Sequence, residues 1–242
     1  CTSNLPDVAV IPSEHFNTLL YTANNTAGRS ITGVGFSPSF IWFKERNATS
    51  HHVLHDAVRG ASGGRLSSNR TNAEDASTSI ASFDSDGFTV GSSAAYINSS
   101  TTNYVAWNWK ANGSGSSNTN GSITSTVSAN VDAGFSIVSY TAPSSTGNFT
   151  IGHGLSSTPD MIITKSRSGA YGWWTWHKDL TNTTTYYLGL NTTSAEISEA
   201  NMWGAGHTSN TLGMNVNASA VGNATYIAYC FHSVDGYSKV GS

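Results

Sequence analysis

The chain matches itself over most of its length. The segment 16–22 (FNTLLYT) aligns with 135–141 (FSIVSYT) at an offset of 119 residues, and the glycines at 33 and 35 align with those at 152 and 154. Further on, 104–110 (YVAWNWK) aligns with 226–232 (YIAYCFH) at an offset of 122. Matches this regular predict two copies of one unit of about 100 residues, each of which must bury its own hydrophobic face.

Four segments follow from this alignment. We expect an extended N-terminal arm over residues 1–14, a first repeat over 15–111, a linker over 112–121 and a second repeat over 122–242. The linker is rich in Gly, Ser and Asn, a composition typical of flexible connections. Residues 236–242 (GYSKVGS) resemble the opening strand of each repeat, so they predict the start of a further copy or a strand that adds to a sheet.

The residue pattern of both repeats predicts the fold class. Short runs of Thr, Val, Ile, Tyr, Phe and Trp recur, and long stretches with a 3.6-residue hydrophobic period are missing. β-branched and aromatic residues suit pleated, half-buried surfaces. The sequence therefore predicts an all-β fold with two tandem β-sandwich domains, of jelly-roll or immunoglobulin-like type, behind the extended arm.

Composition argues against several functions. Only 10% of the residues are charged and the net charge is −3, too little positive charge to hold a phosphate backbone, so we expect no nucleic acid. No apolar run approaches the ~20 residues of a membrane-spanning helix. The chain also lacks a nucleophile elbow and a phosphate-binding loop, so we predict no enzyme, no catalytic residue and no cofactor. A carbohydrate-active enzyme remains a third alternative without a motif.

The cysteines and the glycosylation sequons bear on location. Cys1 and Cys230 could pair within one chain, pair between chains, or be unrelated thiols with Cys230 buried; Cys1 would also fit a lipid-modified bacterial N-terminus. Asn-x-Ser/Thr sequons suggest an extracellular, cell-surface or virion protein and equally suit a polar β-protein without glycans. They occur at Asn24, Asn47, Asn69, Asn98, Asn112, Asn120, Asn148, Asn182, Asn191, Asn217 and Asn223.

Three short motifs have simple structural readings. Asp84 and Asp86 in FDSDGF form a weak candidate for Ca²⁺, but an ordinary Asp-Gly hairpin turn is the favoured interpretation. In HHVLHD (51–56), strand alternation points the histidines to opposite faces, which disfavours zinc. Thr-x-x-Glu ending at Glu74 and at Glu196 predicts two capping boxes, each starting a short helix.

Aromatic residues of the second repeat are candidate glycan contacts. In the strand pattern WWTWH, Trp174 and Trp176 share one face and Trp173 takes the other, so at least one ring is expected at the surface. Exposed aromatic rings stack on sugars or pack at subunit contacts, and a tryptophan spanning two sheets is the competing interpretation. The full set of candidates is Tyr171, Trp173, Trp174, Trp176 and Trp203.

Four longer motifs together carry a resemblance. They are SITSTVSANVDAGFSIVSYT (122–141), GHGLSSTPDMIITKSR (152–167), SFDSDGFTVGS (82–92) and TYIAYCFHSVDGYSKVGS (225–242). As a set they resemble a tandem β-rich domain of unknown function found in bacteriophage structural and tail-fibre-like proteins and in related bacterial or environmental fibre proteins. The resemblance implies β-sandwich modules strung along virions or extracellular fibres, without a known enzymatic activity.

Two functional hypotheses follow. The first is a structural subunit of an extracellular filament or virion fibre whose partners are other copies of itself, joined head to tail by exchange of a terminal strand or arm. In an extended arm Val8 and Val10 point to one side and Ile11 to the other. The assembly residues would be Cys1, Val8, Val10, Ile11, Cys230, Tyr237 and Val240. The alternative is a lectin-like module of a phage tail fibre or adhesin that binds cell-surface glycans.

Overall fold

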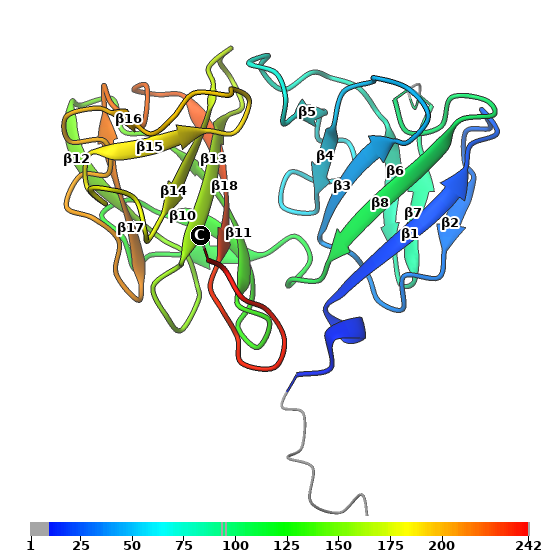
Figure 1. Cartoon of the computed structure of the whole chain (residues 1–242), viewed down its shortest axis with the longest axis horizontal. Coiled ribbons are helices and arrows are strands. Elements are labelled where there is room, and N and C mark those ends of the chain that lie inside the picture. The colour runs from blue at the N-terminus through cyan, green and yellow to red at the C-terminus, as the bar shows by residue number, and fades with distance from the viewer. Residues whose placement is uncertain (1–9, 93, 95, 242) are drawn as a thin grey trace, which may run out of the picture.

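A computed structural model of the chain describes residues 10–92, 94 and 96–241, and these residues form the all-β fold expected from the sequence (Figure 1). One short 3-10 helix, η1 (Pro12–Glu14), precedes the first strand. No helix among the described residues is long and apolar enough to cross a membrane. The β-sandwich architecture follows from alternating strands that bury one face each.

The first half of the chain holds a large and a small antiparallel sheet. The first large sheet has the order β1-β8-β3-β4-β5, and the first small sheet has the order β2-β7-β6. Their bounds are β1 Phe16–Thr22, β2 Ser30–Thr32, β3 Phe40–Glu45, β4 Val53–Asp56, β5 Leu66–Ser67, β6 Ile80–Asp84, β7 Gly87–Val90 and β8 Asn103–Trp109.

The second half repeats this plan with extra strands. The second large sheet has the order β16-β15-β14-β13-β18-β11-β10-β9, and the second small sheet pairs β12 with β17. Their bounds are β9 Ser116–Asn118, β10 Ser125–Asn130, β11 Phe135–Thr141, β12 Gly147–Gly152, β13 Met161–Ser166, β14 Trp173–His177, β15 Tyr186–Gly189, β16 Ile197–Ser198, β17 Thr211–Val216 and β18 Thr225–Phe231.

The central strands of the two large sheets have matching order and register. The order β1-β8-β3-β4 of the first large sheet reappears as β11-β18-β13-β14 in the second. Phe16 pairs with Trp109 in the first large sheet, and Phe135 pairs with Phe231 in the second. These are equivalent positions of the sequence alignment, although common descent of the two halves stays a prediction.

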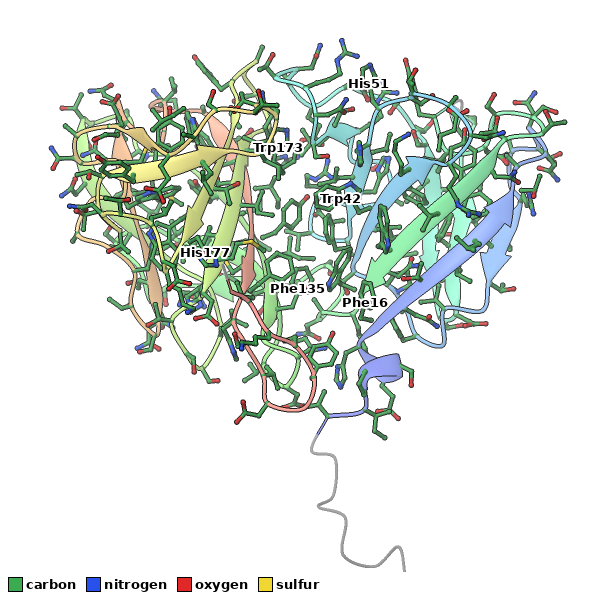
Figure 2. All side chains as sticks on the ribbon, viewed as in Figure 1. Phe16, Trp42, His51, Phe135, Trp173 and His177 are labelled. Carbon is green, nitrogen blue, oxygen red and sulfur yellow. The ribbon has the colours of Figure 1, made fainter. Side chains whose placement is uncertain are left out.

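Three hydrophobic cores arrange the four sheets in layers. One core lies inside each sandwich, and both contain alternate residues of the central strands, such as Phe43 in the first and Tyr226 in the second. The third core lies between the two large sheets and joins Phe40, Leu54 and Leu66 of the first half to Trp173 and Tyr229 of the second, with Phe135, Ile137, Ile163 and Ile227 completing it. Figure 2 shows Phe16, Trp42, Phe135 and Trp173 in the zone where the halves meet.

The segment 112–121 is more ordered than a flexible linker. It contains β9, which pairs with β10, and the backbone N–H of Asn112 donates to Ser128 Oγ at 2.8 Å. Its glycines permit close backbone contact: a Cβ on Gly121 would lie 2.4 Å from the carbonyl oxygen of Thr150. The expectation of a flexible linker is corrected here, because Gly serves close packing in this segment.

The C-terminal segment 236–242 does not form the predicted strand in its described part, residues 236–241. The chain turns back on itself, and Val234 and Ser238 form an isolated antiparallel bridge. The backbone N–H of Val240 donates to Ser233 Oγ at 3.0 Å, and the Tyr237 ring lies edge-on to His15 with ring centroids 5.9 Å apart. The prediction of a further opening strand is wrong, since these local contacts hold the segment on its own chain.

Candidate functional site

Strand β1 forms an edge of the first large sheet. The N–H of Lys110 donates to the His15 carbonyl and the N–H of Ala23 donates to the Thr102 carbonyl, both at 2.8 Å. Because antiparallel hydrogen bonding alternates along a strand, the odd-numbered residues of β1 bond β8 and the even-numbered residues direct their backbone groups outward. No strand of the described part of the chain pairs with this outer side. The Thr18 N–H donates to Asn17 Oδ1 at 2.8 Å and the Thr22 carbonyl accepts from Arg29 Nη1 at 2.7 Å, so another strand can pair here if these side chains give way.

The equivalent strand of the second half has no such open edge. There β10 pairs with β11 over five positions, from Thr126 opposite Ser139 to Asn130 opposite Phe135. β9 then covers β10. The two halves therefore differ at one place in particular: β11 has a neighbour on both sides, and among residues 10–92, 94 and 96–241 β1 has a neighbour on one side only.

Burial of the core-facing side chains reflects this difference. On β11, Val138 is fully buried and Tyr140 is 4% exposed, both within the sandwich core. On β1, Leu19 and Tyr21 occupy the equivalent positions, and both are only partly buried at the margin of the first core. The next residue, Leu20, is 59% exposed on an edge strand. The first sandwich therefore leaves apolar surface uncovered where the second has β10.

A pair of equivalent glycines marks the uncovered space. A Cβ on Gly154 would lie 2.7 Å from Val127 Cγ1 and 3.3 Å from the Ala129 Cβ, because these side chains of β10 pack over it. Among the residues that the structure describes, a Cβ on Gly35 would meet only the Ser13 carbonyl oxygen at 3.9 Å. Both glycines have positive φ, so backbone conformation also favours Gly at each. The slot filled by Val127 and Ala129 in the second half is thus open above Gly35.

An aromatic patch lies on the outer face of the same large sheet. Phe16, Trp42, His52, Trp107 and Trp109 line a shallow hollow of about 350 Å³, and all five are partly buried. Trp42 lies directly opposite Trp107 across β3 and β8. The indole N–H of Trp42 donates to His52 Nδ1 at 3.2 Å. Burial, with the nearby Lys44 and His51, lowers the pKa of His52, so this patch is uncharged at neutral pH.

Three of the five predicted glycan contacts have no exposed ring. Trp173, Trp176 and Trp203 are buried, and each indole N–H donates to a backbone carbonyl: Trp173 to Ser67 at 2.9 Å, Trp176 to Thr183 at 2.8 Å and Trp203 to Tyr186 at 2.7 Å. That part of the prediction is wrong, because the sheets cover both faces of the strand.

The other two predicted contacts do not form one surface with them. Tyr171 is 41% exposed, and Trp174 is partly buried against the core of the second sandwich beside Tyr226. The alternation itself is confirmed, since Trp174 and Trp176 face that core and Trp173 faces the junction. A different pair of tryptophans, Trp42 and Trp107, lies partly buried in the aromatic patch, and the sequence analysis did not single it out as a glycan contact.

The predicted assembly residues differ in burial and do not form one surface in the described part of the chain. Cys1 and Val8 lie outside the described residues. Val10 is buried and Ile11 is 50% exposed at the base of η1, while Tyr237 and Val240 belong to the folded-back C-terminal segment. Cys230 is fully buried in the second sandwich core, and burial raises the pKa of its thiol to about 12. A disulfide from Cys230 to a neighbouring chain is therefore incompatible with this structure.

The metal candidates have other partners. Asp86 accepts from the N–H groups of Gly33 and Gly35 at 3.1 and 2.6 Å, and Asp84 accepts from the Ser82 and Thr89 hydroxyls at 2.6 and 2.7 Å. Gly87 between β6 and β7 has φ of +149°, as a tight turn requires. No group of three or more His, Cys, Asp or Glu among the described positions could hold a metal ion.

The sequons divide by exposure. Nine of the asparagines are exposed: Asn24, Asn47, Asn69, Asn112, Asn120, Asn148, Asn182, Asn217 and Asn223. Asn191 is partly buried. Asn98 is buried, and its Nδ2 donates to the Thr26 carbonyl at 3.0 Å, so a glycan could be attached there only before folding.

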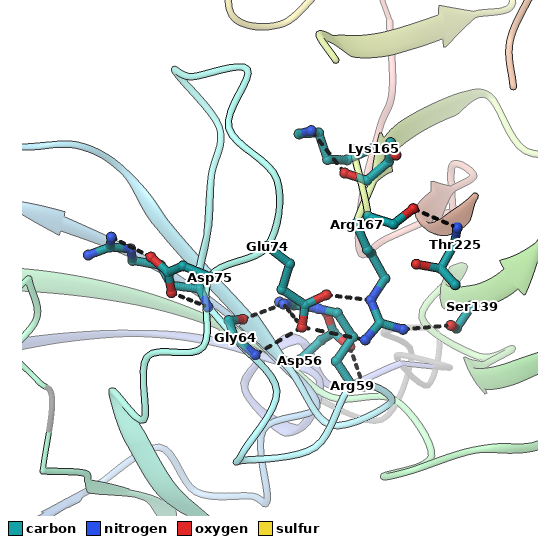
Figure 3. A network of polar contacts seen from close by, with 12 residues as sticks. Asp56, Arg59, Gly64, Glu74, Asp75, Ser139, Lys165, Arg167 and Thr225 are labelled. Carbon is teal, nitrogen blue, oxygen red and sulfur yellow. Dashed lines mark hydrogen bonds and ion pairs between the residues drawn. The ribbon is translucent and has the colours of Figure 1, made fainter. Parts of the chain in front are cut away.

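A buried ionic network joins the two halves (Figure 3). The Arg59 Nε donates to Asp56 Oδ2 at 2.5 Å, and the Tyr229 hydroxyl of the second half donates to the same carboxylate oxygen at 2.8 Å. Glu74 pairs with Arg167 of the second half, Nε to Oε2 at 2.5 Å. Burial alone would lower the pKa of Arg59, but Asp56, Tyr229 and Glu74 raise it overall, so the guanidinium stays charged.

The prediction of capping boxes at Glu74 and Glu196 is wrong. Residues 71–79 contain no helix, and Glu74 accepts from the Gly64 N–H at 2.9 Å while its own N–H donates to the Arg167 carbonyl at 2.8 Å. Glu196 accepts from the Thr181 N–H instead. Lys165, also buried, donates to the carbonyls of Thr71, Ser166 and Gly169. The loop before β6 is therefore clamped onto the second half.

Taken together, the fold and site define a class: two antiparallel β-sandwiches joined rigidly through their large sheets, with one sheet edge open and an aromatic patch beside it. The chain belongs to the family described as Domain of unknown function (DUF7483), whose model matches residues 11–242. Neither a curated protein nor a solved structure gave a match. The domain of unknown function expected from the resemblance is thus confirmed, and the connection to phages and fibres stays a prediction.

Proposed function

We propose that the chain is a non-enzymatic structural subunit that polymerises head to tail with copies of itself through the open edge of β1. One observation carries this proposal: within the described residues, β1 lacks the neighbour that β10 provides to the equivalent strand β11. An open edge beside half-buried Leu19 and Tyr21 binds an extended peptide through main-chain hydrogen bonds and apolar side chains.

The N-terminal arm supplies such a peptide. Residues 1–9 precede Val10, which is buried on its own chain, so the donor peptide would come from this segment. The donor lies before β1 and the acceptor is β1 itself, so each subunit presents both at different surfaces. Repetition of a contact between two different surfaces gives a closed ring where the rotation closes, with a reciprocal dimer as its smallest form, and otherwise a filament.

The rigid junction supports a structural role. The shared core and the buried ionic network hold the two sandwiches as one body, which suits a filament subunit that transmits strain along its length. The nine exposed sequon asparagines support a location outside the cell, on a cell surface or on a virion.

Deleting residues 1–9 should abolish polymerisation and leave folded monomers, because the acceptor edge remains and the donor is lost. Negative-stain microscopy and light scattering would measure assembly, and the thermal unfolding midpoint should stay close to that of the full chain. A matched control replaces residues 1–9 by a Gly/Ser segment of equal length, which cannot supply apolar side chains. Filaments formed by either variant would contradict the proposal.

Glycan binding is a second candidate function, favoured by the aromatic patch. Its uncharged, flat rings suit the apolar face of a neutral pyranose, and the Trp42–His52 hydrogen bond holds one ring in place. On a glycan array, Trp107→Ala should bind about tenfold more weakly than the parent. Tyr171→Ala, which alters an exposed ring elsewhere, should bind as the parent does. Absence of binding by the parent chain would exclude this function.

A further inference from the structure

We infer that residues 5–9 of a second copy form the missing strand, antiparallel to β1, with Val8 opposite Leu19 and above Gly35. This inference rests on the proposed function and specifies the partner, the direction and the register of the contact. The occupant is therefore a segment of this same chain that precedes the described residues.

The second half of the chain provides the template. Val127 of β10 lies opposite Val138 of β11, and its side chain packs over Gly154. At the offset of 119 residues these three positions correspond to Val8, Leu19 and Gly35. Val8 is branched and apolar like Val127, and the slot above Gly35 is open. A valine seated there would cover Leu19 and Tyr21 as β10 covers Val138 and Tyr140.

The position of Pro6, which has no backbone N–H, independently supports this register. With Val8 opposite Leu19, Pro6 lies opposite Tyr21, where the β1 backbone groups point toward β8 and away from the incoming strand. The missing N–H of Pro6 then faces solvent and no ladder hydrogen bond is lost. Leu5, Asp7 and Ala9, which all have an N–H, lie opposite Thr22, Leu20 and Thr18, whose groups face outward. The Thr18 N–H donates to Asn17 Oδ1 and the Thr22 carbonyl accepts from Arg29, so this pairing would exchange the Thr18 bond for one to Ala9. A slip by one residue would put Pro6 in a bonding position and turn Val8 out of the slot.

The connection between arm and β1 explains why the donor comes from another copy. In the second half, β10 returns to β11 through a tight turn in which Gly134 adopts φ of +62°. The equivalent residue of the first half is His15, with φ of −123°, and η1 occupies the place of the turn. A chain with this geometry does not form the same hairpin, so the arm cannot reach its own β1 edge in the way that β10 reaches β11.

Disulfide trapping tests the inference. Val8→Cys and Leu19→Cys would be combined in a Cys1→Ser background, where Cys230 stays buried and unreactive. Leu19 faces the donor as a non-hydrogen-bonded pair, in which Cα atoms lie about 4.5 Å apart, within the range of a disulfide. Mild oxidation should give a ladder of covalent oligomers on a non-reducing gel. Ala9→Cys with Leu19→Cys should give at least about fivefold less ladder, because its side chain points to the other face.

Each outcome has one meaning. A fast-migrating monomer with an internal disulfide would overturn the inference, because the arm would then close on its own edge. Filaments without a ladder would overturn the register and leave the proposed function standing. Failure of the unaltered chain, with Cys1 in place, to form filaments would overturn the proposed function itself. As a check free of cysteine, Val8→Asp should prevent filaments and Ala9→Asp should permit them, and equal behaviour of the two would overturn the inference.

Discussion

Replacing Arg59 with leucine should lower the free energy of unfolding by about 3–5 kcal/mol, because the Asp56 carboxylate would stay buried without its cation. Arg59 also donates to the carbonyls of Gly64 and Leu54, at 2.5 and 3.0 Å, and these acceptors would lose their partner too. Guanidinium denaturation followed by tryptophan fluorescence would measure the change.

Two variants control this result. Arg46→Leu removes a charge from an exposed position and should change the free energy of unfolding by no more than about 0.5 kcal/mol. The double variant Arg59→Leu with Asp56→Leu should recover part of the loss, since it leaves no uncompensated charge in the junction. A cost for Arg59→Leu that matches the Arg46→Leu control would show that the network contributes nothing to stability.

Trp173→Ala should cost about 3–5 kcal/mol and uncouple the two halves. Trp173 extends from β14 into the core between the large sheets, and its indole N–H reaches the carbonyls of Ser67 and Arg70 in the first half, at 2.9 and 3.1 Å. Its removal leaves a cavity at the one core that the halves share. Calorimetry should then resolve two unfolding transitions where the parent shows one.

A second substitution at the same position separates packing from hydrogen bonding. Trp173→Phe keeps most of the buried area and loses the N–H donor, so it should cost about 1–3 kcal/mol and retain a single transition. Tyr171→Ala, at an exposed position two residues earlier, should have little effect. A single unchanged transition for Trp173→Ala would contradict the view that this core couples the sandwiches.

Only the donor part of the candidate site could be predicted from the sequence. The arm was identified as a donor strand from the alternation of Val8, Val10 and Ile11, but its acceptor was not identified. A strand lies at the edge of a sheet when no other strand pairs with one of its sides. The sequences of β1 and β11 are similar in the alignment, so they do not show that the two strands differ in this respect. Only the sheet order shows that β10 covers one of these strands and that the described residues leave the other open.

The sequence by itself determined the all-β class and the face of each strand, because side-chain direction alternates with a period of two whatever the surroundings. It therefore placed Trp174 and Trp176 on one face and Trp173 on the other. Tertiary structure alone decided what covers each face. A second large sheet buries Trp173 and leaves Trp42 and Trp107 at the rim. In the tertiary structure Glu74 forms an ion pair with Arg167 and does not cap a helix as expected. These outcomes depend on contacts between residues about 90 or more positions apart, which no local pattern encodes.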